Sequence, residues 1–349
     1  MRVLTVVGAR PQFIKAAPVS SVLRRDHQEF LLHTGQHYDD AMSDLFFRQL
    51  GIPEPNANLE VGSGPHGAQT GTMLAGIEQF AMELRPDWIL VYGDTNSTLA
   101  GALVGAKLHV PVAHVEAGLR SLDKRMPEEI NRIVADHVST ALLCPTDASV
   151  ANLAREGITQ GVHLVGDVMF DAFRQHLEIA RRDADVLTAL NLKPQGYQLL
   201  TVHRAENTDH RERLAAILHG VGESGRRTLF PVHPRTLAAL ETIGMELPRN
   251  LHLIGPVGYL EMLVLEENAE AIVTDSGGVQ KEAYFAGRPC ITLRHSTEWT
   301  ETVQAGWNTL VDADPQAIGE AMRTFRPHGE RPPMYGDGHA AERVVEAIT

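Results

Sequence analysis

The sequence predicts an α/β protein built from two Rossmann-like domains with parallel sheets, which face each other across a cleft. Short apolar runs alternate with segments of amphipathic-helix length, as in successive βαβ units. The 349 residues are more than one ordinary core accommodates. Polar and charged residues gather directly after the apolar runs, where ligands bind in such domains.

The expected strands are apolar runs bounded by turn residues, at 3–7, 29–32, 88–92, 110–115, 198–202, 229–232, 251–254 and 271–274. The expected helices include 68–84, 127–137, 209–221 and 280–286. A break near 166–183 separates the halves. We therefore expect an N-terminal domain of residues 1–167 plus the last helix, 338–349, and a C-terminal domain of residues 168–337.

The composition excludes several classes of partner. A net charge of −13 argues against nucleic acid or an anionic membrane as a partner. Cys144 and Cys290 lie far apart without metal-ligand spacing, which favours reduced thiols and a cytoplasmic location. The first apolar run is too short for a signal peptide or a transmembrane helix.

The first candidate binding residues follow the first strand. Arg10 lies in the turn after Gly8, and Lys15 lies about one turn into the next helix. A helix N-terminus binds phosphate through its free N–H groups, although two solvent-facing cations would explain the pattern equally well. The turn lacks the GxGxxG fingerprint, so no dinucleotide cofactor is expected.

Three carboxylates of the first half are candidates for catalysis. Asp94 follows the strand at 88–92 and has a structural alternative as a helix cap. Glu116 emerges directly from a strand end, where capping does not explain it. Glu128 opens a helix, where an acid also complements the helix dipole, and Arg132 four residues later could be its ion-pair partner.

The second half offers two strand-end clusters. His203 and Arg204 lie in one short loop together with Glu206, and a structural role for a lone histidine is the alternative. The turn 275–278 contains Gly277 and Gly278, which let a backbone approach a phosphate. Glu282, expected in the first helical turn, would accept ribose hydroxyls. The histidines lack metal-ligand spacing, so no metal is expected.

Taken together, the ordered motifs resemble the non-hydrolysing UDP-N-acetylglucosamine 2-epimerase family. The matching strings are GARPQFIK, GDTNST, HVEAGLRS, MPEEINR, HRAEN, PVHPR, TDSGGVQKE and YGDGHAAER, and they run over almost the whole chain. The resemblance implies a GT-B-like pair of Rossmann domains, usually a homodimer, with a UDP-sugar as substrate and no cofactor.

The resemblance also implies roles for individual residues. The residues that match the catalytic set are Asp94, Glu116, Glu128 and His203, supported by Lys15 and Arg132. The residues that match the UDP-binding set are Arg10, Ser276, Gly277, Gly278, Glu282 and His203, with Tyr259 near the uracil and Arg204 beside His203.

The family's chemistry inverts C2 of the sugar by eliminating UDP to 2-acetamidoglucal and adding it back. This route needs a base on one face, an acid on the other, and cations that hold the leaving diphosphate. We expect Asp94 and Glu128 to transfer protons and Glu116 to shape the sugar site. The alternatives are a hydrolysing epimerase, an epimerase of UDP-2,3-diacetamido glucuronate or a similar sugar, a glycosyltransferase, and a non-enzymatic UDP-sugar sensor.

Two departures from the family pattern matter. Residues 296–302 read STEWTET where many members have TERPE. Ala68 stands where allosteric members carry an Arg, and the spacing after Gln36 reads QHYDDAM. We therefore expect no activation by a second bound UDP-sugar.

Overall fold

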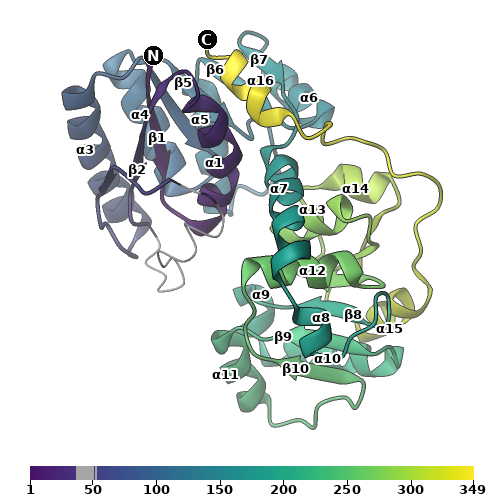
Figure 1. Cartoon of the computed structure of the whole chain (residues 1–349). Helices are drawn as coiled ribbons and strands as arrows, with labels where there is room; N and C mark the ends of the chain where they lie inside the picture. The colour runs from purple at the N-terminus through teal and green to yellow at the C-terminus, as the bar shows by residue number, and fades with distance from the viewer. Residues whose placement is uncertain (37–50, 52) are drawn as a thin grey trace. The chain divides into compact units, whose positions relative to one another are not determined.

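The computed structural model describes residues 1–36, 51 and 53–349, which form two compact units. Unit 1 contains Met1–Arg174 and Pro333–Thr349, and unit 2 contains Gln175–Pro332 (Figure 1). The boundaries expected from the sequence, after 167 and before 338, lie a few residues away. The difference arises because helix α7 (Val168–Asp183) runs without interruption across the first boundary, so no loop marks it.

Unit 1 is built on a seven-stranded sheet with the order β3-β2-β1-β4-β5-β6-β7, and all its strand pairs are parallel. The strands are β1 (Arg2–Val7), β2 (Gln28–His33), β3 (Ala57–Asn58), β4 (Trp88–Tyr92), β5 (Val112–Val115), β6 (Ala141–Cys144) and β7 (Val162–Leu164). Five consecutive residues of β1 are buried, as in strands covered by helices on both faces.

The described helices of unit 1, apart from α7, are α1 (Arg10–Leu23), α3 (His66–Leu84), α4 (Asn96–Leu108), α5 (Pro127–Val138), α6 (Asp147–Arg155) and α16 (Ala340–Glu346). Helices α3, α4 and α5 pack side by side, while α16 packs against α1. Since parallel crossovers are right-handed and the strand order reverses at β1, helices α1 and α4 cover opposite faces of the sheet.

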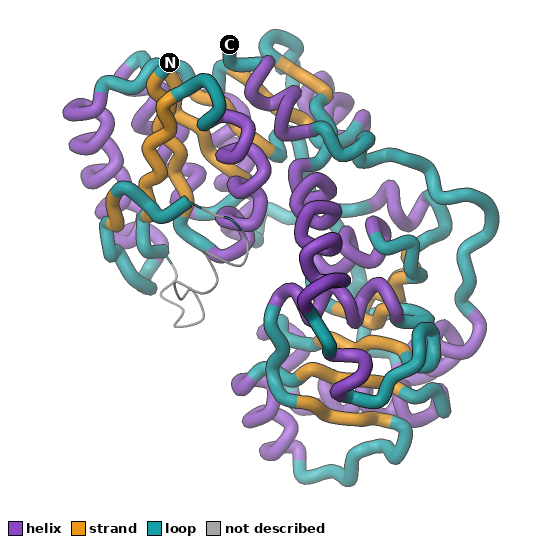
Figure 2. The backbone as a smooth tube through the Cα atoms, in the orientation of Figure 1, coloured by secondary structure: helices purple, strands orange, loops and turns teal. Residues whose placement is uncertain are grey.

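Unit 2 repeats this architecture with a six-stranded parallel sheet in the order β10-β9-β8-β11-β12-β13. Its strands are β8 (Gln198–Thr201), β9 (Thr228–Pro231), β10 (Leu251–Ile254), β11 (Ile272–Thr274), β12 (Cys290–Thr292) and β13 (Asn308–Leu310). Its helices are α8 (Val186–Ala189), α9 (Ala205–Thr208), α10 (Arg211–Ser224), α11 (Pro234–Ile243), α12 (Tyr259–Asn268), α13 (Gly277–Phe285), α14 (Thr300–Gln304) and α15 (Pro315–Thr324). Figure 2 shows the strands of each sheet between their helices.

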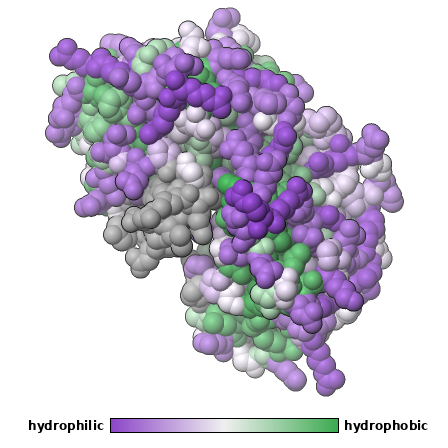
Figure 3. Space-filling view, viewed as in Figure 1, coloured by the Kyte–Doolittle hydropathy of each residue, from purple (hydrophilic) through white to green (hydrophobic). Residues whose placement is uncertain are grey.

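Each unit has its own hydrophobic core. In unit 1, Leu4 and Val91 from the sheet pack with Ile77 of α3, and all three side chains are fully buried. In unit 2, Leu200 of β8 packs with Leu218 of α10, and α15 covers the same side. Polar residues cover most of the face shown in Figure 3, as expected once the apolar residues are inside.

The C-terminal segment returns to unit 1 after unit 2 is complete. Helix α16 buries Ala340, Val344 and Val345, and the backbone N–H of Ala341 donates to Asp171 Oδ2 at 2.8 Å. The backbone N–H of Asp167 donates to the carbonyl of Tyr335. These contacts anchor the last residues to the sheet that begins with β1.

The strand orders define where a ligand is expected to bind. In each sheet the direction of winding reverses between two neighbouring strands, β1 and β4 in unit 1 and β8 and β11 in unit 2. The carboxyl ends of such strands form the ligand-binding edge of this class of fold. The candidate residues of the sequence follow β1, β4 and β5 in unit 1 and β8 and β11 in unit 2, except for Tyr259, which follows β10.

Candidate active site

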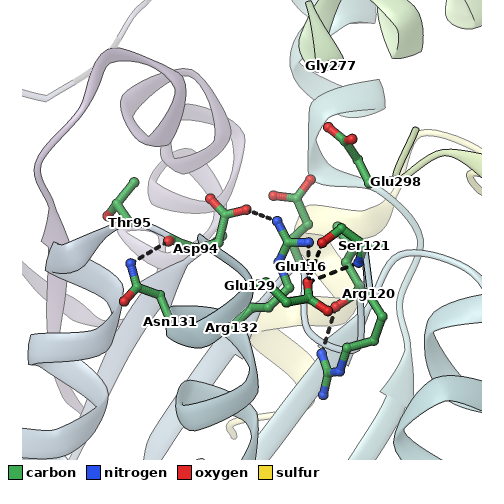
Figure 4. Close-up of polar contacts among 12 residues, drawn as sticks. Asp94, Thr95, Glu116, Arg120, Ser121, Glu129, Asn131, Arg132, Gly277 and Glu298 are labelled. Atoms are coloured by element: carbon green, nitrogen blue, oxygen red, sulfur yellow. Dashed lines mark hydrogen bonds and ion pairs between the residues drawn. The ribbon is translucent and has the colours of Figure 1, made fainter. Parts of the chain in front are cut away.

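Asp94, the residue after the β4 turn, does not cap a helix. The N-cap of α4 is Thr95, whose hydroxyl accepts a hydrogen bond from the backbone N–H of Thr98. The Asp94 carboxylate instead forms an ion pair with Arg132 of α5 (Figure 4). The capping alternative for Asp94 is therefore wrong, and its carboxylate lies at the edge where chemistry is expected.

Arg132 links two carboxylates, and Glu128 is not one of them. Its guanidinium donates to Asp94 and, at 2.9 Å, to Glu129 Oε2. Glu128 is exposed, so the ion pair with Arg132 that the four-residue spacing suggested does not form. The spacing was misleading because Arg132 points back across the first helical turn toward the β4 loop, while Glu128 is left facing the cavity described below.

Glu129 is a functional candidate that the sequence did not distinguish from its neighbour. Its side chain is buried, and it accepts hydrogen bonds from the backbone N–H groups of Ser121 and Leu122, each at 2.9 Å. It thereby anchors the loop after β5 while holding Arg132. The Glu-Glu pair alone gave no signal, because only the fold decides which acid faces inward.

Glu116 is 7% exposed and forms an ion pair with Lys15 of α1. Its backbone has a positive φ of 71°, which a non-glycine residue adopts at a cost. Gly93 lies beside this pair with a φ of 63°, and a Cβ there would be 3.3 Å from both Glu116 Oε2 and Lys15 Nζ. The carboxylate and the ammonium thus stay close only because position 93 lacks a side chain.

Beside Asp94 and Glu128 the protein encloses a cavity of about 360 Å³. The described lining residues are Ala9, Pro11, Gln36, Ser63, Gly64, His66, Gln69, Asp94, Thr95, Asn96, Pro127, Glu128 and Asn131. These residues include the starts of four helices, α1, α3, α4 and α5. Their N-terminal dipole ends favour negative charge in the cavity, such as the charge that develops when a proton leaves carbon.

Amide side chains give the cavity wall a fixed shape. Asn131 Nδ2 donates to the carbonyl of Asp94 at 3.0 Å and to Asn96 Oδ1 at 3.1 Å. Asn96 Nδ2 in turn donates to Gln69 Oε1 at 2.8 Å. This chain joins α3, α4 and α5 directly behind Asp94, so the cavity is preorganised.

Arg10 lies at the first helical position of α1 rather than in the preceding turn, because the helix starts earlier than the glycine turn suggested. It is half-buried next to Ala9 and Pro11, which line the cavity.

In unit 2 the His203–Arg204 turn is fixed by Asp275, which is fully buried after β11. Asp275 accepts hydrogen bonds from the backbone N–H groups of both residues and from Asn207 Nδ2, at 3.1 Å each. The His203 ring lies 3.3 Å from Asp275 through Nδ1. Half of the His203 side chain is exposed, yet desolvation by the surrounding loop lowers its pKa below the ordinary value, against the pull of Asp275.

The glycine turn after β11 leads directly into α13, with Ser276 as the N-cap. A Cβ on Gly278 would meet nothing closer than Ser276 Oγ at 3.8 Å, whereas a Cβ on Gly277 would overlap Glu298 Oε1. Because the helix begins at Gly277, Glu282 lies in its second turn, and the expectation of the first turn is wrong. Its side chain is buried.

Four residues that the sequence did not single out surround this turn. Glu298 pairs with Arg294 at 2.9 Å and lies 4.0 Å from Arg204. Burial opposes ionisation of Glu298, but the two arginines outweigh it and hold its pKa below the ordinary value. Trp299 Nε1 donates to the Gly277 carbonyl at 2.9 Å, and Lys281 Nζ lies 4.2 Å from the Trp299 ring centroid. Residues 296–302, which read STEWTET, therefore help to hold the turn before α13 in place.

Tyr259 begins α12 and is half-buried, with its ring edge-on to His176 at a centroid distance of 5.6 Å. It lies in the same unit as the His203 and Ser276 turns.

One group of described residues has the spacing of metal ligands, namely Glu206, His295 and Asp312. Arg213 forms ion pairs with both carboxylates of this group, at 2.5 Å to Asp312 and 3.7 Å to Glu206. The guanidinium thus supplies the positive charge that a cation would supply. This group of three residues therefore fits an ion-pair network with Arg213 at least as well as it fits a metal site.

Comparison with known proteins identifies the family. The sequence profile of the family described as UDP-N-acetylglucosamine 2-epimerase matches residues 21–349. The chain belongs to the UDP-N-acetylglucosamine 2-epimerase family. The resemblance noted in the sequence is thereby confirmed.

The relatives of this family that the chain resembles match it over its whole length. A UDP-N-acetylglucosamine 2-epimerase homolog of Methanococcus maripaludis is 52% identical over 100% of this chain and 99% of its own. A UDP-2,3-diacetamido-2,3-dideoxy-D-glucuronate 2-epimerase of Pseudomonas aeruginosa is 47% identical over the same shares. The crystal structure of the Methanocaldococcus jannaschii UDP-GlcNAc 2-epimerase, in complex with UDP-GlcNAc and UDP, has a TM-score of 0.89 at 43% identity, covering 100% of this chain and 99% of that one.

These epimerase structures have the architecture expected from the sequence, so the prediction of two GT-B-like, parallel-sheet domains is confirmed. In the part of the chain that the structure describes, no helix combines the length and apolar character needed to cross a bilayer.

Proposed function

We propose that this member of the epimerase family interconverts UDP-N-acetylglucosamine and UDP-N-acetylmannosamine without hydrolysing them. The observation that carries the proposal is the cavity in which Asp94 and Glu128 face one space at the ends of four helices. Two carboxylates in one preorganised cavity supply the base and the acid that inversion at carbon requires.

The reaction proceeds by elimination and re-addition. One carboxylate removes the C2 proton while the C1–O bond to UDP breaks, which leaves 2-acetamidoglucal with a double bond between C1 and C2. The other carboxylic acid then delivers a proton to the opposite face of C2 as the UDP oxygen bonds again to C1. Each proton-transfer group contributes roughly 10²–10⁴-fold to the rate.

The remaining candidates have supporting roles. Arg132 holds the Asp94 carboxylate in place, and Glu116 with Lys15 shapes the sugar site. In unit 2, the α13 N-terminus and the Ser276–Gly278 turn hold the diphosphate, and Glu282 accepts the ribose hydroxyls. His203, Arg204 and Tyr259 also bind UDP in unit 2, and Arg10 is the UDP-binding candidate of unit 1. We also propose that the chain acts as a cytoplasmic homodimer.

The charge of the cavity supports a neutral sugar over a uronate. Among its described lining residues there is no Lys or Arg, while Asp94 and Glu128 are both acidic. A C6 carboxylate placed there would be repelled by both acids, and the partial charges of the helix N-termini would be its positive partners among the described lining residues. UDP-N-acetylglucosamine is therefore favoured over UDP-2,3-diacetamido glucuronate, although the Pseudomonas aeruginosa relative carries the latter activity in its name.

The decisive experiment incubates the purified protein with UDP-N-acetylglucosamine in deuterated water, without nicotinamide or added metal, and follows the products by proton NMR. We expect both epimers to form, each with deuterium at C2. Epimerisation that keeps the original hydrogen at C2 would overturn the elimination mechanism. Release of UDP with a free sugar would identify a hydrolysing enzyme, and turnover of the uronate substrate alone would reverse the assignment of the sugar.

A further inference from the structure

His114 lies inside unit 1 and makes two hydrogen bonds through its ring. It is fully buried in the middle of β5, paired in register with Val91 on β4 and Leu142 on β6. Its Nε2 lies 2.7 Å from the carbonyl oxygen of Gly93, and its Nδ1 lies 2.7 Å from Asp136 Oδ1. Both ring nitrogens are therefore engaged, one on each side of the ring.

Both partners of the ring are acceptors. A backbone carbonyl has no proton to donate, and an ionised carboxylate accepts only. The second oxygen of Asp136 accepts from Arg120 Nη1 at 2.7 Å and from the backbone N–H of Gly118 at 3.1 Å. Against the effect of burial, Arg120 favours the ionised form of Asp136 and helps to hold its pKa low, so Oδ1 is an acceptor as well. A ring that donates to both neighbours is an imidazolium.

The charges around the ring balance when the imidazolium faces an ionised Asp136. Arg120 also forms a two-pronged pair with Glu156, at 2.6 and 2.8 Å. Along the chain of contacts from His114 through Asp136 and Arg120 to Glu156, positive and negative charges alternate. Their net charge is zero, as buried ionic groups require. A neutral ring would leave one uncompensated negative charge among side chains that are mostly buried.

Other titratable groups lie near this network. His137 of α5 lies 3.8 Å from Glu156, at the half-exposed end of the network away from His114, where water screens its charge. Burial raises the pKa of the Cys144 thiol on β6 to about 12, so it stays uncharged. Lys15 and Glu116 neutralise each other. Burial of Asp136 opposes its ionisation, yet the charges of His114 and Arg120 hold its pKa below the ordinary value.

We propose that His114 is a positioning residue whose imidazolium locks together the two turns that carry Asp94 and Glu116. Gly93, its acceptor on one side, directly precedes Asp94. Gly118, bound through Asp136 on the other side, lies two residues after Glu116. This inference rests on the roles proposed above for these two carboxylates.

Backbone strain explains why such a lock is needed. Gly93, Glu116 and Gly118 all have positive φ values, of 63°, 71° and 80°. A non-glycine residue such as Glu116 keeps this conformation only when its surroundings hold it there. The hydrogen bond from His114 holds the turn at Gly93, and the hydrogen bond to Asp136 holds the turn at Gly118. Loss of the imidazolium therefore loosens the turns that carry Asp94 and Glu116, although His114 itself does not contact the substrate.

The protonation state is tested directly on the full chain with ¹⁵N-labelled histidine and long-range ¹H–¹⁵N correlation spectra, assigned through the backbone. Both nitrogens of His114 should carry protons in these spectra. His33 is the matched control, because it is also buried at the end of a strand of the same sheet, yet its Nε2 has no hydrogen-bond partner. Burial lowers its pKa, against the Gly8 backbone hydrogen bond, so its ring should be neutral. One unprotonated nitrogen in His114 would overturn the proposal.

The positioning role is tested by His114→Gln. A glutamine amide donates to Gly93 or to Asp136, but its oxygen must then face the other acceptor. We expect kcat to fall by about 10- to 100-fold with little change in KM, since a small displacement of catalytic groups has effects of this size. In the double variant His114→Gln/Asp136→Asn, the glutamine amide can donate to the Gly93 carbonyl while its oxygen accepts from the asparagine amide. This uncharged pair should recover part of kcat.

The outcomes separate this inference from the proposed function. A His114→Gln enzyme with unaltered kcat, or a loss confined to KM, contradicts the positioning role. If the unaltered protein shows no epimerase activity, the proposed function fails while the NMR spectra still decide the protonation state of His114. His33→Gln, which interrupts neither turn, should keep kcat close to that of the unaltered enzyme. The NMR measurement needs no variant, so a variant that fails to fold leaves the test intact.

Discussion

Arg132 of helix α5 forms an ion pair with Asp94, which follows strand β4, although the two residues are far apart in the sequence. The same guanidinium reaches Glu129, so one planar group sets the position of a proposed proton-transfer group and of the loop after β5. We predict that Arg132→Lys lowers kcat by at least about tenfold, because an ammonium does not reproduce the fork that serves both carboxylates. Arg125→Lys, which alters an exposed pair on the preceding loop, should leave steady-state rates unchanged.

The three acids of the candidate site should each be essential. Asp94→Asn, Glu116→Gln and Glu128→Gln are expected to lower kcat by at least about 10²-fold, with melting curves close to that of the unaltered protein. Asp123→Asn is a surface control from the same region and should retain full turnover. Near-normal turnover in all three variants would refute the site assignment. A variant that slowly releases UDP and the glycal would be arrested between elimination and re-addition.

The two glycines at the start of α13 should respond differently to alanine. Both Gly277→Ala and Gly278→Ala should weaken UDP binding in calorimetry, because either methyl group lies at the proposed diphosphate site. Only Gly277→Ala should also lower the melting temperature of the free protein, since its Cβ would overlap Glu298 Oε1 and displace a carboxylate that Arg294 holds. Unchanged UDP affinity in both variants would move the diphosphate away from this turn.

Asp171 makes stability depend on pH. Burial raises its pKa from 3.8 to about 6, against the backbone hydrogen bonds from Ala341 and Ala340, and its Oδ1 has no hydrogen-bond partner. The folded state therefore binds the Asp171 proton more tightly than the unfolded state does. The resulting contribution to the free energy of unfolding is complete below about pH 4 and is lost as the pH rises through about 6.

Asp171→Asn stays uncharged, so it should melt at least about 2 °C above the unaltered protein at pH 7.5. This difference should shrink toward pH 4, where Asp171 is itself protonated. A difference in melting temperature that does not change over this range would show that the carboxyl does not titrate in the folded protein.

We predict that no second UDP-sugar activates the enzyme. Ala68 is exposed in helix α3 and cannot contact a diphosphate, whereas an arginine–phosphate contact is commonly worth roughly 1.5–3 kcal/mol. The altered spacing after Gln36 lies in residues 37–42, outside the described residues. The reverse reaction from UDP-N-acetylmannosamine should start linearly and follow a hyperbola. A lag removed by a trace of UDP-N-acetylglucosamine would show that an activating site exists, with Arg204 as the candidate cation.

The sequence predicted the parts of this protein that depend on local pattern. Apolar runs such as that of β1 and β4 gave strands within a residue or two, and the residues after them are the ones that line the cavity or the α13 turn. Short buried strands such as β6 and β12 were missed, because four or fewer apolar residues are not distinguishable from part of a helix.

The missed site residues depend on the direction in which a side chain points. Glu128 and Glu129 are adjacent, and their sequence context does not tell which one holds Arg132. The network of His114 and Asp136 joins residues on a strand and on the following helix, and their partnership appears only once β5 and α5 pack together. Glu298 likewise acquires its meaning from Gly277, whose missing Cβ leaves room for the carboxylate.

The return of Pro333–Thr349 to unit 1 has a consequence for biosynthesis. A ribosome delivers the sheet of unit 1 first, then all of unit 2, and only afterwards the helix that packs on α1. During synthesis and folding of the second unit, the face of α1 that packs against α16 therefore stays uncovered. Its final closure is a late step, so a translation arrest anywhere in unit 2 leaves an exposed apolar surface for chaperones and proteases to recognise.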